Sequence, residues 1–341
     1  MLNLAVRPYY RPFRKPLQTH HGLWEKREGL IVRLQDDEGR VGLGEIAPIP
    51  WFGTETLDEA KDFCSGWSQP FLPEAIATIP NTFPACQFGF GSALRFRDQV
   101  PLAARDRFPL AGCNDPVGNI PEEPGPLVCA LLPTGAAALH AWSSLWQKGH
   151  RTFKWKIGVT SLQEELSLFR ALVNALPSNA YLRLDANGGL TPNTANQWLT
   201  ACDAAHGKVE FLEQPLPPDH ILDWVVQASD TFQTAIALDE SVATLKQLQQ
   251  VYQQLQSRVV YVVKPAIAGF PEKLRTLCTQ HRLDVVFSSA LETPIGRQAT
   301  LNLAQELWAV GISRRALGFG VGHWFQDDWD ILSEADLWQQ L

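Results

Sequence analysis

From residue 126 onward, short apolar stretches alternate with amphipathic stretches at a regular interval. The apolar stretches are rich in β-branched residues and predict buried strands, and the stretches between them have the 3.6-residue spacing of helices. The predicted strands are 127–133, 152–158, 181–187, 209–216, 234–241, 258–268 and 283–293, with 316–320 as a candidate eighth strand. The predicted helices are 136–146, 161–176, 192–204, 221–229, 244–255, 271–280 and 294–309.

This alternation favours a parallel sheet whose outer face is covered by helices. Seven or eight strand–helix units favour a closed (β/α) barrel, although the region is lean for that fold, which typically needs about 250 residues. An open doubly wound sheet is the alternative, but no glycine-rich turn follows the first predicted strand to favour it.

The N-terminal region has a different pattern, typical of a β-meander. Residues 30–34 alternate, 36–39 form a turn, and 41–46 form the return strand. Residues 56–67 have helical spacing, with Thr56 as the predicted N-cap. Residues 100–125 are rich in Pro, Gly and Asn, which predicts an interdomain linker.

Charged residues occur at the ends of five consecutive predicted strands. They are Lys154 and Lys156, then Asp185, Glu213, Asp239 and Lys264. Because successive positions lie about one strand–helix unit apart, these side chains are expected at the same height, at the carboxyl end of the sheet. Barrel enzymes place their chemistry at that end.

Strand periodicity refines this prediction, because alternate residues of a strand face the same side. Lys154 and Lys156 are expected to share a face, with Trp155 pointing toward the helices. Asp185 and Asn187 are expected to share a face in the same way.

Three carboxylates on neighbouring strands cannot converge unpaired, because like charges repel and desolvation is costly. A hard divalent cation resolves the conflict, and an all-oxygen donor set suits Mg²⁺, with Mn²⁺ as the alternative. Cys or His ligands for zinc are not found nearby in the sequence. One such charged residue alone would most simply be a salt-bridge partner, but five strand ends in register favour a site.

Two lysines flank the carboxylates in strand order, Lys156 on one side and Lys264 on the other. A lysine near a metal and a second cation can have its pKa lowered, which makes it a usable base. A small-molecule carboxylate bound to the metal would become an enediolate when its α-proton leaves, and the metal would stabilise that charge.

Composition and charge exclude several other classes of function. The net charge is −7, the isoelectric point is about 5.6, and no Lys/Arg block stands out, so nucleic acid is not an expected partner. No apolar run reaches the roughly 18 residues needed to span a bilayer, and no secretory signal is recognisable. The 6 cysteines are scattered without a C-x-x-C pair, which predicts reduced thiols and a cytoplasmic location. Nothing in the sequence predicts the oligomeric state.

The strand-end motifs resemble those of the enolase superfamily, in the branch of the muconate-lactonizing enzymes. The motifs are K-x-K (154–156), L-D-A-N (184–187), E-Q-P (213–215), L-D-E-S (238–241) and K-P (264–265). The resemblance covers nearly the whole chain. It implies an α/β protein with an α+β capping domain over 1–122, a (β/α)7β TIM-type barrel over 123–320 that carries the active site, and a C-terminal segment over 321–341 returning toward the capping domain.

Within this branch, three further stretches resemble o-succinylbenzoate synthases, particularly cyanobacterial ones. They are 19–34, 44–60 and 287–297, the last containing Ser-Ser-Ala. Dipeptide epimerases usually carry an Asp-x-Asp after the last strand, whereas Asp327 and Asp328 are adjacent here and lie later. A dipeptide epimerase is therefore less favoured, and an N-acylamino acid racemase or dipeptide epimerase is kept as the alternative. No residue favours a muconate cycloisomerase. A non-catalytic barrel that binds a metal and a carboxylate is a remote alternative, because both lysines are present.

The resemblance implies a reaction and a role for each residue. Mg²⁺, held by Asp185, Glu213 and Asp239, would bind the ring carboxylate of 2-succinyl-6-hydroxy-2,4-cyclohexadiene-1-carboxylate. Lys156 would remove the α-proton and return it to the departing hydroxyl. Lys264 would lie over the other face of the ring as a cation. The remaining expected substrate contacts are Lys154, Asn187, Ser288 and Ser289. The product would enter menaquinone or phylloquinone synthesis.

Weaker signals in the sequence either leave two interpretations open or favour a structural role. The segments 51–53 and 20–22 are either lids over the substrate or ordinary packing. The glycines of 318–322 indicate close backbone packing at the barrel rim. His140 and His323 have no partner recognisable in the sequence and are expected to be structural.

Overall fold

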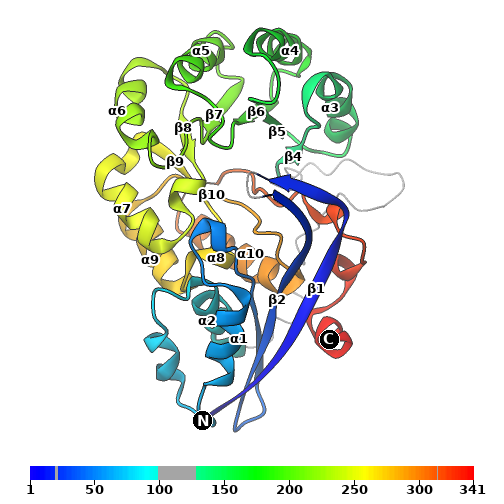
Figure 1. Cartoon of the computed structure of the whole chain (residues 1–341), viewed down its shortest axis with the longest axis vertical. Helices are drawn as coiled ribbons and strands as arrows, with labels where there is room; N and C mark the ends of the chain where they lie inside the picture. The colour runs from blue at the N-terminus through cyan, green and yellow to red at the C-terminus, as the bar shows by residue number, and fades with distance from the viewer. Residues whose placement is uncertain (20–21, 99–127, 313) are drawn as a thin grey trace.

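The larger of two sheets is parallel and follows the chain order. In the computed structural model, which describes residues 1–19, 22–98, 128–312 and 314–341, its strand order is β10-β9-β8-β7-β6-β5-β4 (Figure 1). The strands are β4 (Ala130–Leu131), β5 (Thr152–Lys156), β6 (Tyr181–Asp185), β7 (Val209–Glu213), β8 (Ile236–Leu238), β9 (Val259–Val263) and β10 (Val285–Phe287). Parallel neighbours require a crossover after each strand, which the intervening helices provide.

Two residues close the barrel in place of a full eighth strand. Leu317 pairs in parallel with Val128, and Gly318 pairs in parallel with Ser288. The Gly318 N–H also donates to the Phe287 carbonyl at 2.8 Å. The close approach favours glycine at 318, because a Cβ there would lie 2.8 Å from Ser288 Oγ and 3.2 Å from Ser288 Cα. The predicted barrel is thus confirmed, with its eighth position reduced to this short bridge between β10 and the chain entering β4.

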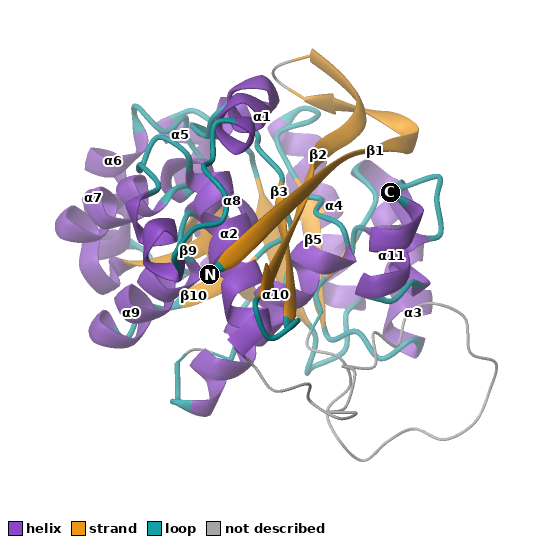
Figure 2. Ribbon diagram, turned by 90° about the horizontal axis from the view of Figure 1, so that it is seen from below, coloured by secondary structure: helices purple, strands orange, loops and turns teal. Residues whose placement is uncertain are grey.

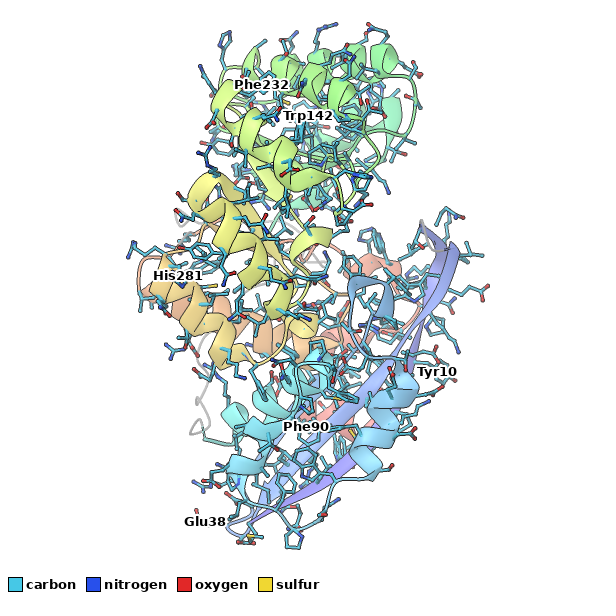
Figure 3. The ribbon with its side chains drawn as sticks, turned by 60° about the vertical axis from the view of Figure 1, so that its left-hand side comes forward. Tyr10, Glu38, Phe90, Trp142, Phe232 and His281 are labelled. Carbon is cyan, nitrogen blue, oxygen red and sulfur yellow. The ribbon has the colours of Figure 1, made fainter. Side chains whose placement is uncertain are left out.

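Helices cover the outside of the sheet (Figure 2). They are α3 (Ala138–Gln147), α4 (Leu162–Ala175), α5 (Pro192–Asp203), α6 (Ile221–Thr231), α7 (Leu245–Leu255), α9 (Pro271–His281) and α10 (Pro294–Ala309). Trp155 is buried against Trp198 of α5, which in turn contacts Phe169 of α4, so the predicted outward direction of Trp155 is confirmed. Figure 3 shows Trp142 and Phe232 in this outer layer.

The strand predicted over 258–268 is too long. It ends at Val263, and a short helix, α8 (Pro265–Ala268), follows Lys264. Pro265 has no N–H for the ladder and a φ suited to the first turn of a helix, so it ends the strand where the sheet ends.

Short 3₁₀ helices occur in the connections of the described chain. They are η1 (Pro50–Phe52), η2 (Pro73–Thr78), η3 (Gly135–Ala137), η4 (Glu240–Val242), η5 (Gln256–Arg258), η6 (Gly322–Trp324) and η7 (Trp329–Ile331).

The capping domain is built on an antiparallel sheet in the order β1-β2-β3. Its elements are β1 (Leu2–Thr19), β2 (Gly22–Asp36), β3 (Val41–Ile46), α1 (Leu57–Ser65) and α2 (Pro84–Asp98). Thr56 is the N-cap of α1, as the sequence predicts, and it forms a capping box with Glu59. The long β1–β2 hairpin extends toward the barrel in Figure 1 from the end of the molecule where Glu38, in the turn between β2 and β3, is labelled in Figure 3.

The C-terminal segment lies against the capping sheet. Leu337 and Trp338 of α11 (Glu334–Gln340) pack with Tyr9 and Ile31. The predicted limit at 122/123 and the predicted linker 100–125 lie outside the described residues, so the division into domains stays a proposal. Among the described residues, no helix combines the length and the apolar composition needed to cross a membrane.

A largely buried ionic network joins β6 and β7 to the segment that closes the barrel. Arg183 of β6 is 2 % exposed and donates to the Glu210 carboxylate at 2.7 Å and to the Ala316 carbonyl at 2.7 Å. Arg315 donates to the same carboxylate. The network therefore holds the closing segment against β6 and β7.

Replacement of Glu210 by glutamine is expected to lower the free energy of unfolding at pH 7 by about 3–5 kcal/mol, because Arg183 is left buried without its counter-charge. Burial disfavours the Glu210 carboxylate, but Arg183 and Arg315 together lower its pKa. The carboxylate thus contributes stability above its unfolded pKa, and this contribution is lost as the pH falls through the lowered folded pKa. Urea unfolding of both proteins at pH 7 and at lower pH measures the effect, and equal midpoints at pH 7 would contradict it.

Candidate active site

The strand ends bring the six predicted charged residues to one cavity. In the sheet register, Lys156 pairs with Asp185 and Asp185 with Glu213. Asp239 follows the last residue of β8, and Lys264 follows the last residue of β9. Together with Lys154 they line a cavity of about 720 Å³ at the carboxyl end of the barrel, a size that suits a small ligand.

Two of the three lysines are paired with carboxylates. The Lys154 ammonium lies 2.8 Å from Asp185 Oδ2 and 2.8 Å from Glu213 Oε1. Lys264 forms an ion pair with Asp239. Burial opposes the charge of Lys154, but the carboxylates of Asp185 and Glu213 raise its pKa well above the ordinary value. Lys154 is therefore a permanent cation in this arrangement.

Lys156 differs from the other two lysines. It is the last residue of β5 and its side chain is exposed. Within the described part of the chain, its ammonium group has no hydrogen-bond or ion-pair partner. Of the three, it is the lysine whose nitrogen is open to a ligand in the cavity.

The acidic groups of the site are deeply buried. Glu213 is 1 % exposed, and burial raises its pKa to about 8 against the effect of Lys154, with the charges of Asp185 and Asp239 adding to the rise. Burial likewise raises the pKa of Glu240 to about 7, and Asp239 contributes. Carboxyl groups are thus crowded at the strand ends, where burial and the neighbouring carboxylates make the ionised form of each one less favourable.

This donor set fits a hard divalent cation. Three carboxylates on adjacent strands supply only oxygen donors, and the Lys154 ammonium already places positive charge between two of them. Among the described residues, no three His, Cys, Asp or Glu side chains form a ready-made metal cluster. Instead, Asp185 and Glu213 face Lys154, and Asp239 faces Lys264.

The capping domain forms the opposite wall of the cavity. The ring of Phe52 lies 4.8 Å from the Lys264 nitrogen, and Trp51 packs edge-on against Trp24 with centroids 5.0 Å apart. Leu17, Trp24 and Phe52 line the cavity. The predicted lid 51–53 thus contributes Phe52 to the site, whereas His20 and His21 of the other predicted lid lie outside the described residues.

The three predicted polar contacts also line the cavity, with different partners. The Asn187 side-chain amide donates to Glu240 Oε1 at 3.2 Å. The Ser289 hydroxyl donates to the Glu292 carboxylate at 3.0 Å. Ser288 lies against Gly318 at the closing bridge. The hydroxyl of Ser289 is therefore engaged within the protein.

Glu240 and His323 are among the cavity residues that were not predicted as part of the site. Glu240 directly follows Asp239, and its Oε2 atom is buried with no hydrogen-bond partner among the described residues. Its position beside a strand-end carboxylate could have indicated it. His323, expected to be structural, lines the cavity, and burial lowers its pKa, with the nearby Arg14 contributing. Only the folded path of the C-terminal segment brings His323 there.

A capped parallel barrel with carboxylates and lysines at its strand ends is the architecture of the enolase superfamily. Residues 137–331 match the family model described as enolase C-terminal domain-like, and residues 4–96 match the MenC N-terminal domain.

Curated relatives identify the family within this superfamily. The o-succinylbenzoate synthase of Thermosynechococcus vestitus is 41% identical over 324 residues, 93% of this chain and 92% of that protein. The o-succinylbenzoate synthase of Klebsiella pneumoniae is 30% identical over 275 residues, 79% of this chain and 76% of that protein. The chain belongs to the o-succinylbenzoate synthase family, as its motifs predict.

Solved structures agree with this assignment. The crystal structure of o-succinylbenzoate synthase from Thermosynechococcus elongatus BP-1, complexed with Mg in the active site, matches with a TM-score of 0.82 and 39% identity and covers 99% of both chains. A dipeptide epimerase from Enterococcus faecalis V583 matches with a TM-score of 0.70 at 22% identity, covering 92% of this chain and 88% of that one. At that identity the second match shows the shared fold alone.

Proposed function

We propose that the chain catalyses the Mg²⁺-dependent syn-dehydration of 2-succinyl-6-hydroxy-2,4-cyclohexadiene-1-carboxylate to 2-succinylbenzoate. The observation that carries the proposal is one cavity in which an open lysine, Lys156, lies beside three strand-end carboxylates, with a second lysine, Lys264, on their far side. The family membership supports the same reaction.

In this proposal Asp185, Glu213 and Asp239 hold the metal. When bound, Mg²⁺ supplies positive charge that stabilises the negative charge developing on the substrate carboxylate as the α-proton leaves. Lys154, a permanent cation beside Asp185 and Glu213, orients these ligands and the carboxylate of the substrate.

Lys156 carries out both proton transfers. Its neutral amine takes the proton from the ring carbon next to the carboxylate, and the electrons of the broken C–H bond pass into the carboxylate. The resulting ammonium then gives that proton to the hydroxyl at the neighbouring ring position. The C–O bond breaks, water leaves, and the returning electrons make the ring aromatic. A single lysine serves both steps because hydrogen and hydroxyl leave from the same face.

Lys264 acts as a positive charge on the other side of the ring. Its ion pair with Asp239 and its contact with the Phe52 ring hold it at the cavity wall. A cation facing a π-system that gains negative charge is favourable in such a partly desolvated site. The apolar wall formed by Leu17 and Trp24 suits the ring and the succinyl chain.

Product identification tests this function. Purified protein with Mg²⁺ and the cyclohexadiene substrate is expected to yield 2-succinylbenzoate, recognised by its aromatic proton resonances and by the loss of one water in the mass spectrum. Unchanged substrate, with the protein folded and metal present, would refute the proposal.

The position of two lysines on opposite sides of the carboxylates also suits racemisation of N-acylamino acids. One lysine would remove the α-proton and the other would return a proton to the opposite face. Incubation with N-succinyl amino acids in D₂O separates the two functions, because deuterium at the α-carbon without loss of water marks the racemase.

We also propose that the product enters menaquinone or phylloquinone synthesis and that the protein acts in the cytoplasm, without nucleic-acid or membrane partners. Five cysteines of the described chain are free and buried, which is typical of a reducing compartment.

A further inference from the structure

We propose that Glu165 is a positioning residue for the base, because it fastens the chain that leaves β5 immediately after Lys156. This inference rests on the proposed function in one respect, namely that Lys156 performs the proton transfer. Glu165 lies on α4, outside the cavity, and no motif at the strand ends contains it.

The Glu165 carboxylate binds three consecutive backbone N–H groups. Gly158 N–H donates to Oε2 at 2.8 Å, Val159 N–H to Oε1 at 2.8 Å and Thr160 N–H to Oε1 at 3.1 Å. Glu165 is 3 % exposed. Hydrogen bonds to a carboxylate are about twice as strong as those between neutral groups. The three hydrogen bonds to Glu165 are also shielded from water.

The strand around Lys156 needs such support, because it is paired on one side only. The neighbour β4 ends at Leu131, and the last hydrogen bond from that side runs from Leu132 N–H to the Lys154 carbonyl at 2.8 Å. At Lys156 the remaining partner is Asp185 of β6. Two residues after Lys156 the chain turns at Gly158, whose φ of 76° suits glycine.

The backbone of Lys156 therefore lies between two anchors. On one side it has the ladder to β6, and after it comes the loop 158–160, whose N–H groups have Glu165 as their common acceptor. Because the Lys156 ammonium has no partner of its own in the described chain, the backbone determines where the amine can reach. A shift of about 1 Å in a reacting group can cost about 100-fold in rate.

A matched pair of residues makes the test specific. Glu164 and Glu165 both lie in the first turn of α4, where a negative charge interacts favourably with the helix N-terminus. Glu164 is exposed, and its side chain has no partner in the loop 158–160. Comparison of Glu165→Ala with Glu164→Ala isolates the carboxylate that holds the loop.

Glu165→Ala is expected to lower kcat roughly 10- to 100-fold with KM changed by less than about threefold. The primary deuterium isotope effect on kcat is expected to rise, because proton abstraction becomes more strongly rate-limiting. The kcat of Glu165→Gln should lie between those of the wild type and Glu165→Ala, because the single amide oxygen of glutamine can accept from at most two of the three N–H groups. Glu164→Ala should behave as the wild type.

Amide hydrogen exchange supplies a readout that needs no substrate. In Glu165→Ala the amides of 158–160 should lose protection while those of 153–155 keep it. Local loss of protection together with unchanged kcat and isotope effect would overturn the positioning role, and so would loss of protection throughout the barrel. If the wild type fails to dehydrate the cyclohexadiene, the proposed function falls, and the same variants are compared by α-proton exchange of N-succinyl amino acids.

Discussion

Replacement of Lys156 by alanine is expected to lower kcat by about 10³- to 10⁴-fold or more, the largest effect of any single substitution in the cavity. The reason is that one amine serves as base and then as acid, so its loss removes both proton transfers. KM should change little, because the substrate carboxylate is held elsewhere. Steady-state kinetics at saturating Mg²⁺ measures the effect.

Two further variants separate the base from its charge. Lys156→Arg keeps a positive charge but cannot supply a neutral base at ordinary pH, so it should be as inactive as the alanine variant. Lys246→Ala removes an exposed lysine of α7 outside the cavity and should retain wild-type turnover. Substantial activity in Lys156→Arg would show that the residue contributes charge and not proton transfer.

Replacement of Glu213 by glutamine is expected to lower kcat/KM by about 10³-fold, which corresponds to several kcal/mol of lost charge stabilisation. Glu213 ends the central strand of the three, between Asp185 and Asp239, and is 1 % exposed. Glutamine has nearly the same volume, and Lys154 retains Asp185 as its partner. The loss should therefore reflect the metal and not the fold.

Titration calorimetry with Mg²⁺ or Mn²⁺ tests this prediction directly. The metal affinity of Glu213→Gln should fall more than about 100-fold, since groups that merely orient a metal ligand are already worth about 10- to 100-fold. Glu74→Gln, at an exposed position of the capping domain, should bind metal as the wild type does. Normal affinity in a folded Glu213→Gln protein would remove Glu213 from the ligand set.

The barrel could be predicted from the sequence because each strand and each helix has a local hydrophobic pattern, and that pattern repeats along the chain. Each strand is buried on both faces, so it appears as a short apolar run, and each helix has one apolar face. The charged residues at the strand ends were recognisable for the same reason: a parallel sheet places them at one edge, and Lys156, Asp185 and Glu213 are indeed neighbours in the register.

Most features that escaped prediction depend on tertiary contacts, whereas the early end of the strand predicted over 258–268 has a local cause in Pro265. That strand ends at Val263, because Pro265 starts a helix. The candidate eighth strand is reduced to a bridge at Leu317 and Gly318. His323 reaches the cavity only through the path of the C-terminal segment. Glu165 has the sequence signature of an ordinary acid in the first turn of a helix, and its contacts with the preceding loop appear only in the fold.

Continuous absorbance measurement of the cyclohexadiene substrate tests the central claim most directly. With Mg²⁺ present, the diene absorbance should decay at a rate proportional to the wild-type concentration, stop on addition of EDTA, and resume when excess Mg²⁺ is restored. Decay that continues unchanged in EDTA, or no decay by folded protein saturated with Mg²⁺, would contradict a metal-dependent dehydration at these strand ends.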